Sequence, residues 1–270
     1  MISSALRSSC RASAKLCSLA SRQSQLARRS IHNLPLLANQ ATYEQQGIPG
    51  LYSKEGFRDV WTEYQQYLVD ELSRETAETE HETRTPFGIM LNTAASQLDA
   101  PVFNFASQAH NNHLFVEALN SPLTNQTRPS PKLLEAIQKY FEDLDTLKAD
   151  IIELATLPEN LAPGWVFLVE GDDKSLYLTY AFQAGSPYFA GRSQAFDLNT
   201  PMSKEIEETL DSIQLDVLEK APTYNMPLIA INCWDVAYIT DFKVAGREAF
   251  IEKVWKSLNW DVINKRFYGN

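Results

Sequence analysis

Cysteine and histidine are scarce in this chain of 270 residues, which contains three cysteines and four histidines. Cys10 and Cys17 lie in a basic N-terminal segment, so Cys233 is the one cysteine in the rest of the sequence. This excludes a disulfide framework and a zinc site built from paired cysteines. No apolar run approaches the length needed to cross a bilayer, so no membrane partner is expected.

Three common catalytic patterns are also missing, namely a glycine-rich phosphate loop, a nucleophile elbow and a helical His-Glu-x-x-His. His81 lies in a charged stretch and is predicted to be exposed. His110 and His113 are three residues apart, which places them on adjacent parts of one helical face. Without a third ligand this pair is a weak metal signal. We expect one of the two to pack against aromatic side chains and the other to face solvent.

Acidic residues are absent from residues 1–31, which hold six basic residues and nine serines. This composition is typical of a mitochondrial presequence, with cleavage expected near Ser30–Ile31 and the mature protein in the mitochondrial matrix. A secretory signal is excluded because Lys15 and Arg22 interrupt every candidate apolar run. The alternative is a disordered basic tail that binds nucleic acid.

Removing residues 1–31 changes the charge balance, because the whole chain has 24 basic and 34 acidic residues and this segment holds 6 and 0. The remainder has a formal charge of 18 − 34 = −16. Such an acidic body cannot hold a phosphate backbone through its net field. Any link to nucleic acid should therefore pass through protein partners or a few local contacts.

The first half of the mature sequence predicts helices. Ser53 is a plausible N-cap for a helix that places six apolar or aromatic residues on one face. They are Phe57, Val60, Trp61, Tyr64, Leu68 and Leu72. Residues 101–120 predict a second, buried helix, and residues 121–130 a linker. We therefore place an N-terminal helical domain at residues 32–126.

Residues 127–270 combine helices with a short antiparallel sheet. Ser130 and Pro131 start one helix. Strands are predicted near residues 165–169, 176–180 and 227–231, followed by a helix over 241–258. An insertion at about 187–224 contains one amphipathic helix, which either packs on its own domain or docks a partner. The order of elements gives an α+β fold, not an alternating one.

Residues 229–242 have the layout of a catalytic strand end, because an apolar strand runs directly into an aromatic-rich turn. A metal enzyme of this layout would need a carboxylate and an imidazole here. The sequence has Asn232 and Val236 at those positions.

Motifs along nearly the whole mature chain resemble those of the iron/manganese superoxide dismutases, in the same order. They are His32-Asn33-Leu34-Pro35, Tyr52-Ser53-Lys54-Glu55, Val102-Phe103-Asn104 with Ala106 and Gln108, Gly164-Trp165, Trp234 with Ala237-Tyr238, Asp241, and Asn259-Trp260. The resemblance implies a dismutase-like fold, with an N-terminal helical hairpin domain followed by an α/β domain.

The resemblance also identifies where the family holds its metal. The four ligand positions fall on Val60, Asn112, Asn232 and Val236, and none carries the family's ligand. His113 is one residue from the second position, which is a rotation of about 100° on a helix. The family's active-site tyrosine is replaced by Leu68, while the polar Gln108 is retained. We therefore expect no metal, no other cofactor and no catalytic residue, with apolar volume filling the vacated site.

Two subunits of the active enzymes are tied together by a glutamate of the last motif and a histidine of the first helix. Asp235 and Tyr64 stand at those positions, and Val236 and Ile239 replace their usual partners. A symmetric dimer of the enzyme's type is therefore not expected. These four residues are instead predicted to form a partner interface.

Mitochondrial targeting together with a degenerate metal site resembles the dismutase-like proteins of the fungal mitochondrial small ribosomal subunit. This implies an inactive, structural component that acts through protein–protein contacts in mitochondrial translation. Small-subunit proteins are the expected partners, together with a heterodimer formed with a paralogous dismutase-like protein and at most limited contact with ribosomal RNA. The alternative is a mitochondrial iron/manganese superoxide dismutase with rearranged ligands, involving His110 and His113.

Overall fold

The computed structural model describes residues 31–94, 96–171, 173–188 and 225–268. The predicted presequence, apart from Ile31, and the amphipathic helix of the predicted insertion lie outside these residues. The N-terminal elements are α2 (Gln40–Gln46), α3 (Lys54–Phe57), the π-helical segment η1 (Arg58–Glu63), α4 (Tyr64–Thr76), α5 (Pro86–Thr93) and α6 (Ala100–Glu117). They are followed by α7 (Pro131–Phe141), α8 (Leu144–Thr156), the 3-10 turn η2 (Pro158–Asn160), β1 (Gly164–Glu170) and β2 (Leu176–Phe182). The last elements are β3 (Met226–Asn232), the 3-10 turn η3 (Asp235–Ala237), α10 (Ile239–Phe242), α11 (Arg247–Ser257) and α12 (Trp260–Tyr268).

One continuous helical rod is formed by α3, η1 and α4. It begins where predicted, because the Ser53 hydroxyl accepts a hydrogen bond of 3.0 Å from the main-chain N–H of Gly56. The Asp241 carboxylate, far along the chain, accepts another of 3.0 Å from the main-chain N–H of Ser53. Five of the six residues on the predicted apolar face are at most 1% exposed, and Tyr64 is half-buried.

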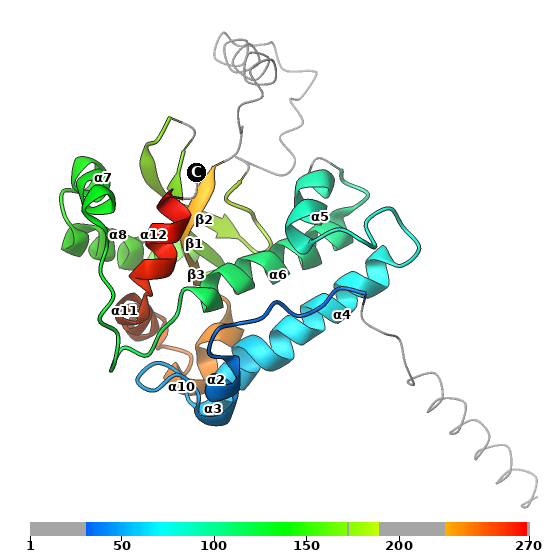
Figure 1. Cartoon of the computed structure of the whole chain (residues 1–270), viewed down its shortest axis with the longest axis horizontal. Helices are drawn as coiled ribbons and strands as arrows, with labels where there is room; N and C mark the ends of the chain where they lie inside the picture. Colours follow the sequence, from blue (N-terminus) through cyan, green and yellow to red (C-terminus); the bar gives the residue numbers. More distant parts are fainter. Residues whose placement is uncertain (1–30, 95, 172, 189–224, 269–270) are drawn as a thin grey trace, which may run out of the picture.

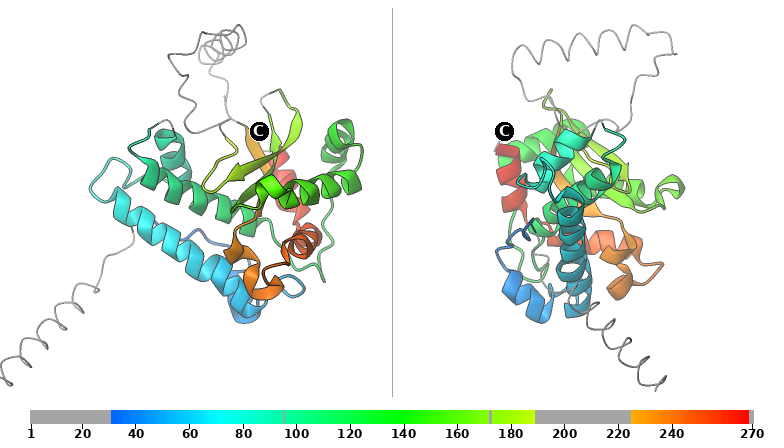
Figure 2. Two further views of the ribbon diagram at one scale, coloured as in Figure 1. Left: turned by 180° about the vertical axis from the view of Figure 1, so that it is seen from behind. Right: turned by 90° about the vertical axis from the view of Figure 1, so that its right-hand side faces the viewer.

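Helices α4 and α6 lie side by side, and α5 packs against α6 near one end of this pair (Figure 1). The sheet and the helices α7, α8 and α12 lie on the opposite side of α6 from α4, and α11 lies beside the C-terminal end of α6 (Figure 2). Since α6 contacts both α4 and β3, it is the element that connects the helical half with the sheet.

The sheet has three antiparallel strands in the order β2-β1-β3, which confirms the predicted strands. Every residue of the central strand β1 is buried, so helices cover both faces of the sheet. Gly164 begins β1, where an added Cβ would lie 2.6 Å from the carbonyl oxygen of Ala181. The register places Trp165 opposite Asn232, the last residue of β3, and so fixes where β3 ends relative to β1.

The single helix expected over residues 241–258 is wrong, because two helices occupy this stretch. Helix α10 ends at Phe242, Lys243 adopts φ +65°, and α11 begins at Arg247. Gly246 lies directly against the main chain of Phe242, a position that would exclude a Cβ atom. The tight turn between the two helices is a local backbone feature that apolar spacing does not report.

The largest apolar cluster in the described residues contains side chains from both sides of the predicted domain boundary at 126/127. Main-chain hydrogen bonds join the end of α6 to the α11–α12 junction, from Asn120 N–H to Ser257 (2.7 Å) and from Asn259 N–H to Ala118 (2.8 Å). The two predicted domains therefore share one core. Within the described part of the chain, no helix is long and apolar enough to span a membrane.

Candidate functional site

The four positions singled out in the sequence come from four elements: Val60 from η1, Asn112 from α6, Asn232 from the end of β3, and Val236 from η3. The first three side chains are completely buried, at 0% exposure. Val236 is half-buried. The fold thus brings three of the four positions into the interior, where α6 passes between η1 and the end of β3.

Side-chain amides meet at this point. The Asn232 amide nitrogen donates to the side-chain oxygen of Asn112 across 3.1 Å. The Asn112 nitrogen in turn donates to the main-chain carbonyl of Val60 at 3.0 Å and to the side-chain oxygen of Gln65 at 2.9 Å. We name Gln65, Asn112 and Asn232 the amide ladder, which crosslinks the first helical rod, α6 and β3.

Main-chain groups anchor the ladder at both ends. The Asn232 side-chain oxygen accepts from the main-chain N–H of Trp234 at 2.9 Å, and the Gln65 nitrogen donates to the carbonyl of Ala109 at 2.9 Å. Gln65 is 1% exposed, so all three amides are removed from water. Buried amides are costly unless they are paired, and here each one is paired through both its oxygen and its nitrogen.

The anchors determine which way each amide points. Because the Trp234 N–H is a donor, the Asn232 oxygen must face it and the Asn232 nitrogen must face Asn112. Asn112 must then present its oxygen to Asn232 and its nitrogen to the Val60 carbonyl, which is an acceptor. Gln65 must finally accept from Asn112. Reversing any one amide would place two donors or two acceptors together.

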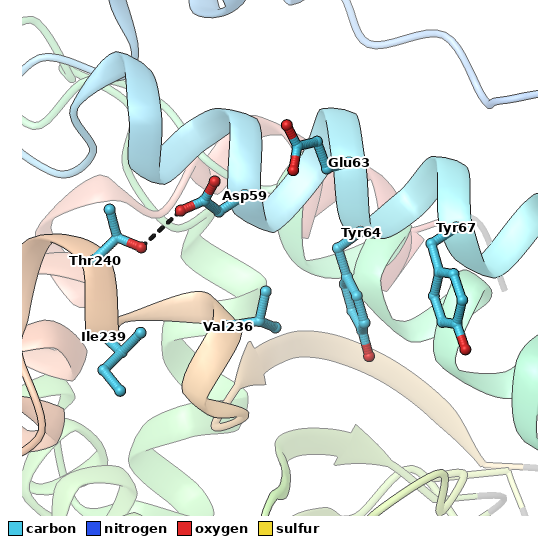
Figure 3. A pocket seen from close by; sticks show the side chains of 7 residues that line it. All are labelled: Asp59, Glu63, Tyr64, Tyr67, Val236, Ile239 and Thr240. Atoms are coloured by element: carbon cyan, nitrogen blue, oxygen red, sulfur yellow. Dashed lines mark hydrogen bonds between the residues drawn. The ribbon is translucent and has the colours of Figure 1, made fainter.

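A groove of about 360 Å³ opens on the surface beside the ladder. It is lined by Asp59, Glu63, Tyr64, Tyr67, Val236, Ile239 and Thr240. Figure 3 shows that one wall comes from the η1–α4 helix and the other from η3 and α10. The two walls are joined by a hydrogen bond of 2.7 Å from the Thr240 hydroxyl to the Asp59 carboxylate. We call these seven residues the interface groove.

Three of the four residues predicted to form a partner interface line this groove, namely Tyr64, Val236 and Ile239. The fourth, Asp235, is exposed and accepts a hydrogen bond of 2.7 Å from the Tyr238 hydroxyl. Tyr64 donates its hydroxyl to the side-chain oxygen of Gln108 at 2.7 Å, and burial raises the pKa of this phenol. Tyr64 therefore joins the groove wall to the interior as a neutral donor.

Residues 129–266, about half of the chain, match the family model described as iron/manganese superoxide dismutases, C-terminal domain. The chain belongs to the iron/manganese superoxide dismutase family. Two similar proteins come from Schizosaccharomyces pombe. One is named small ribosomal subunit protein mS43, with 29% identity across 87% of this chain and 84% of that protein. The other is named small ribosomal subunit protein mS42, with 26% identity across 82% and 90%.

Enzymes of the family are also similar to this chain. The mitochondrial manganese superoxide dismutase of Drosophila melanogaster is 27% identical over 62% of this chain and 61% of that enzyme. Membership in the dismutase family confirms the fold class predicted from the sequence motifs.

The family's iron or manganese does not fit the residues present here. Asn112 and Asn232 supply neutral amides whose oxygen and nitrogen atoms are already bonded within the ladder, and Val60 supplies no donor side chain. Redox metals of this kind are held by imidazole and carboxylate groups. Among the described residues, no group of three or more His, Cys, Asp and Glu side chains could hold a metal ion.

The expectation that apolar volume fills the former site is only partly correct. Val60 is buried in the core, but the two asparagines make polar contacts, and Val236 lies in the interface groove. The sequence showed that the four positions assigned by the resemblance carry no His, Asp or Glu. It could not show that Gln65, one turn after Val60, points inward and completes a hydrogen-bonded network.

The two histidines of α6 face a different pocket, of about 320 Å³. The ring nitrogen Nε2 of His110 lies 2.7 Å from the Tyr188 hydroxyl, and burial, with His113 and Arg266 nearby, lowers the pKa of His110 to about 3. His113 is half-buried with its ring 6.0 Å from that of Trp61. Burial lowers its pKa as well. One histidine packs against aromatic side chains as expected, but the expectation that the other faces solvent is wrong.

Two other histidines also differ from simple surface residues. The side chain of His81 is only 12% exposed, so its predicted exposure is wrong. His32 is buried, with its ring nitrogen Nε2 2.8 Å from the Thr76 hydroxyl, and burial lowers its pKa. The charged sequence around His81 concealed that the chain after α4 folds back on itself.

Arg247 is a buried charge that the sequence analysis missed. Its guanidinium donates to the main-chain carbonyls of Asn160 (2.9 Å) and Cys233 (3.0 Å) and to the Tyr180 hydroxyl (2.9 Å). Burial raises the pKa of the Cys233 thiol, which therefore stays protonated at neutral pH. This cluster fixes the turn after β3, and no sequence pattern indicated it.

Proposed function

We propose that this protein is a catalytically inactive, structural component of the mitochondrial small ribosomal subunit. The observation that carries the proposal is the amide ladder, because two of its residues, Asn112 and Asn232, stand at positions that the resemblance assigns to metal ligands. The two S. pombe proteins, whose names place them in the small ribosomal subunit, support it because the similarity extends over most of this chain and most of each of them.

The absence of dismutase activity follows from the chemistry of the ladder. A dismutase needs a metal that changes oxidation state. The four positions that the resemblance assigns to metal ligands offer two amides that already make hydrogen bonds and two aliphatic side chains. What remains is a rigid shape with a crosslinked interior. Such a scaffold suits a role in which the surface, not the interior, carries the function.

The partner we propose is a paralogous dismutase-like protein, bound at the interface groove. Tyr67 and Ile239, at 54% and 41% exposure, offer apolar contact area. The groove also presents Asp59 and Glu63, which are only partly neutralised by Arg58 at 3.6 and 3.1 Å. A two-fold contact between identical grooves would bring these carboxylates together, so a different partner surface is favoured.

The mitochondrial matrix is the proposed location. The basic, serine-rich residues 1–31 support import, since they lack any acidic residue. The acidic remainder, with a formal charge of −16, supports a position held mainly by protein contacts, because RNA repels such a body.

Sedimentation tests the proposal. Mitochondria expressing a tagged full-length chain would be lysed in moderate salt and separated on a sucrose gradient. We expect the tagged protein in the fractions of the small ribosomal subunit. A protein that stays at the top of the gradient, while the small subunit migrates away, would contradict the proposal.

A further inference from the structure

Exposed cations gather around the connector that leads from α6 to α7. This connector crosses the α11–α12 region before it reaches α7 (Figure 1). Arg128 lies on the connector, Lys132 in the first turn of α7, and Lys265 with Tyr268 in the last turns of α12. All four side chains are exposed. We call them the basic patch.

Direct contacts hold the parts of the patch together. The side chain of Asn264 donates to the main-chain carbonyl of Arg128 at 3.0 Å and accepts from the main-chain N–H of Ser130 at 2.8 Å. The Lys132 ammonium lies 5.6 Å from the centre of the Tyr268 ring, within the range of a cation–π contact. These contacts bring the connector, the start of α7 and the end of α12 together.

The cations of the patch are available for an external anion. Across the described residues, no carboxylate lies within 4.0 Å of the charged groups of Arg128, Lys132 or Lys265. The same helices also carry Glu135 and Asp261, three residues after Lys132 and four before Lys265. These acids limit the local positive charge, so the patch suits a few phosphates and not an extended duplex.

We propose that the basic patch binds a single-stranded segment of RNA, with the three cations on phosphates and the Tyr268 ring under a base. Phosphate contacts need Lys and Arg, and an exposed aromatic ring flanked by cations is the arrangement on which unpaired bases stack. An acidic peptide would use the cations but not the exposed ring. This inference rests on the proposed function, in which ribosomal RNA is the nucleic acid that the protein would meet.

Ultraviolet cross-linking of small subunits that contain the full chain tests this patch. Cross-linked peptides would be identified by mass spectrometry after nuclease digestion. We expect nucleotide adducts on peptides covering residues 128–132 or 265–268. The mapping uses the unaltered protein, so it does not depend on how any variant folds.

A triple variant, Arg128→Gln with Lys132→Gln and Lys265→Gln, provides the second arm. The matched control carries Arg74→Gln, Arg84→Gln and Lys148→Gln, which removes the same charge elsewhere. Both the triple variant and the control should sediment with the small subunit, because protein contacts hold the chain there. The triple variant should lose cross-link yield on the order of tenfold, while the control keeps it.

The outcomes separate the two proposals. Co-sedimentation without nucleotide adducts at the patch, or with a protein cross-linked there instead, would overturn the RNA assignment and leave the proposed function standing. Failure to co-sediment would contradict the proposed function. The patch would then be tested with purified mature protein and a short single-stranded RNA of uridines, where equal affinity of the triple variant and the control would overturn it.

Discussion

Asn232 and Asn112 lie 120 positions apart, and the side chain of one donates a hydrogen bond of 3.1 Å to the side chain of the other. Both are completely buried. This bond joins β3 to α6 in the interior of the molecule, at two of the four positions that the resemblance assigns to metal ligands. The interior positions that the resemblance assigns to the family's metal ligands thus form a crosslink whose donors and acceptors match.

Replacing Asn232 by aspartate tests this match. The carboxylate of Asn232→Asp would face the Asn112 oxygen, and Asn112 cannot reverse because the Val60 carbonyl lies on its other side. We expect a loss of about 3 kcal/mol in the free energy of unfolding near neutral pH, because a buried charge is left facing an acceptor. Urea unfolding measures it.

The pH dependence of this variant has a definite sign. Once protonated, the introduced carboxyl group can donate to Asn112, so burial should raise its pKa in the folded state above the unfolded value of about 4. The loss of stability caused by Asn232→Asp should therefore be small below a pH of about 4 and should grow as the pH rises. Asn104→Asp, on an exposed position of the same helix as Asn112, is the control and should change stability little. Equal effects of the two substitutions would contradict the ladder.

A double-mutant cycle measures the bond between the two asparagines. Asn112→Ala and Asn232→Ala each leave a buried amide without its partner, and the double variant removes both amides. We expect the double variant to lose less stability than the sum of the single variants, by about 1–2 kcal/mol. Additive losses would mean that the two side chains do not interact.

Much of this fold was accessible from the sequence, since helical spacing identified the buried face of the first rod and the three strands were predicted within two residues of their bounds. The predicted loss of the metal ligands could be made from the sequence, because it depends only on residue identity at the positions that the resemblance assigns. The ladder was not, because Gln65 has no pattern that distinguishes an inward amide from a surface one. The break between α10 and α11 was missed because it depends on the backbone at Lys243 and Gly246.

Acid should weaken the protein through its buried histidines. The pKa of His110 is lowered to about 3 by burial, so the unfolded chain binds a proton below its ordinary value of about 6.5 and the folded chain does not. Stability is therefore lost as the pH falls. From about pH 7 to about pH 5 the loss from this group should be about 2 kcal/mol.

His110→Gln separates this effect from that of other groups. Glutamine can still bond to the Tyr188 hydroxyl but does not titrate, so the variant should show a shallower decline of unfolding free energy with falling pH. Urea midpoints measured over this pH range provide the comparison. A decline as steep as in the unaltered protein would show that His110 is not responsible.

The interface groove should tolerate substitution without loss of the fold. Ile239→Asp adds a charge to an apolar wall at 41% exposure, so partner binding should fall by at least about tenfold while the melting temperature changes little. Co-purification with the partner measures the binding. Val244→Asp is the matched control, because Val244 is 80% exposed on the same stretch and does not line the groove. Equal loss in both variants would argue against the groove.

Restoring the ligands tests whether the family's geometry is kept. Val60→His, Asn112→His, Asn232→Asp and Val236→His together recreate the family's ligand set. We expect this fourfold variant to bind manganese or iron near one ion per chain. A control with Asn232→Asp alone should bind none, because one carboxylate does not make a site. A folded fourfold variant without metal would indicate that the backbone around the ladder has moved.

The most direct test of the central claim is the metal content of the mature, unaltered protein, purified after expression with iron and manganese supplied. Elemental analysis would be combined with a dismutase assay on the same sample. The amide ladder predicts far less than one metal ion per chain and no activity above the buffer. Near-stoichiometric iron or manganese, together with dismutase activity, would contradict it.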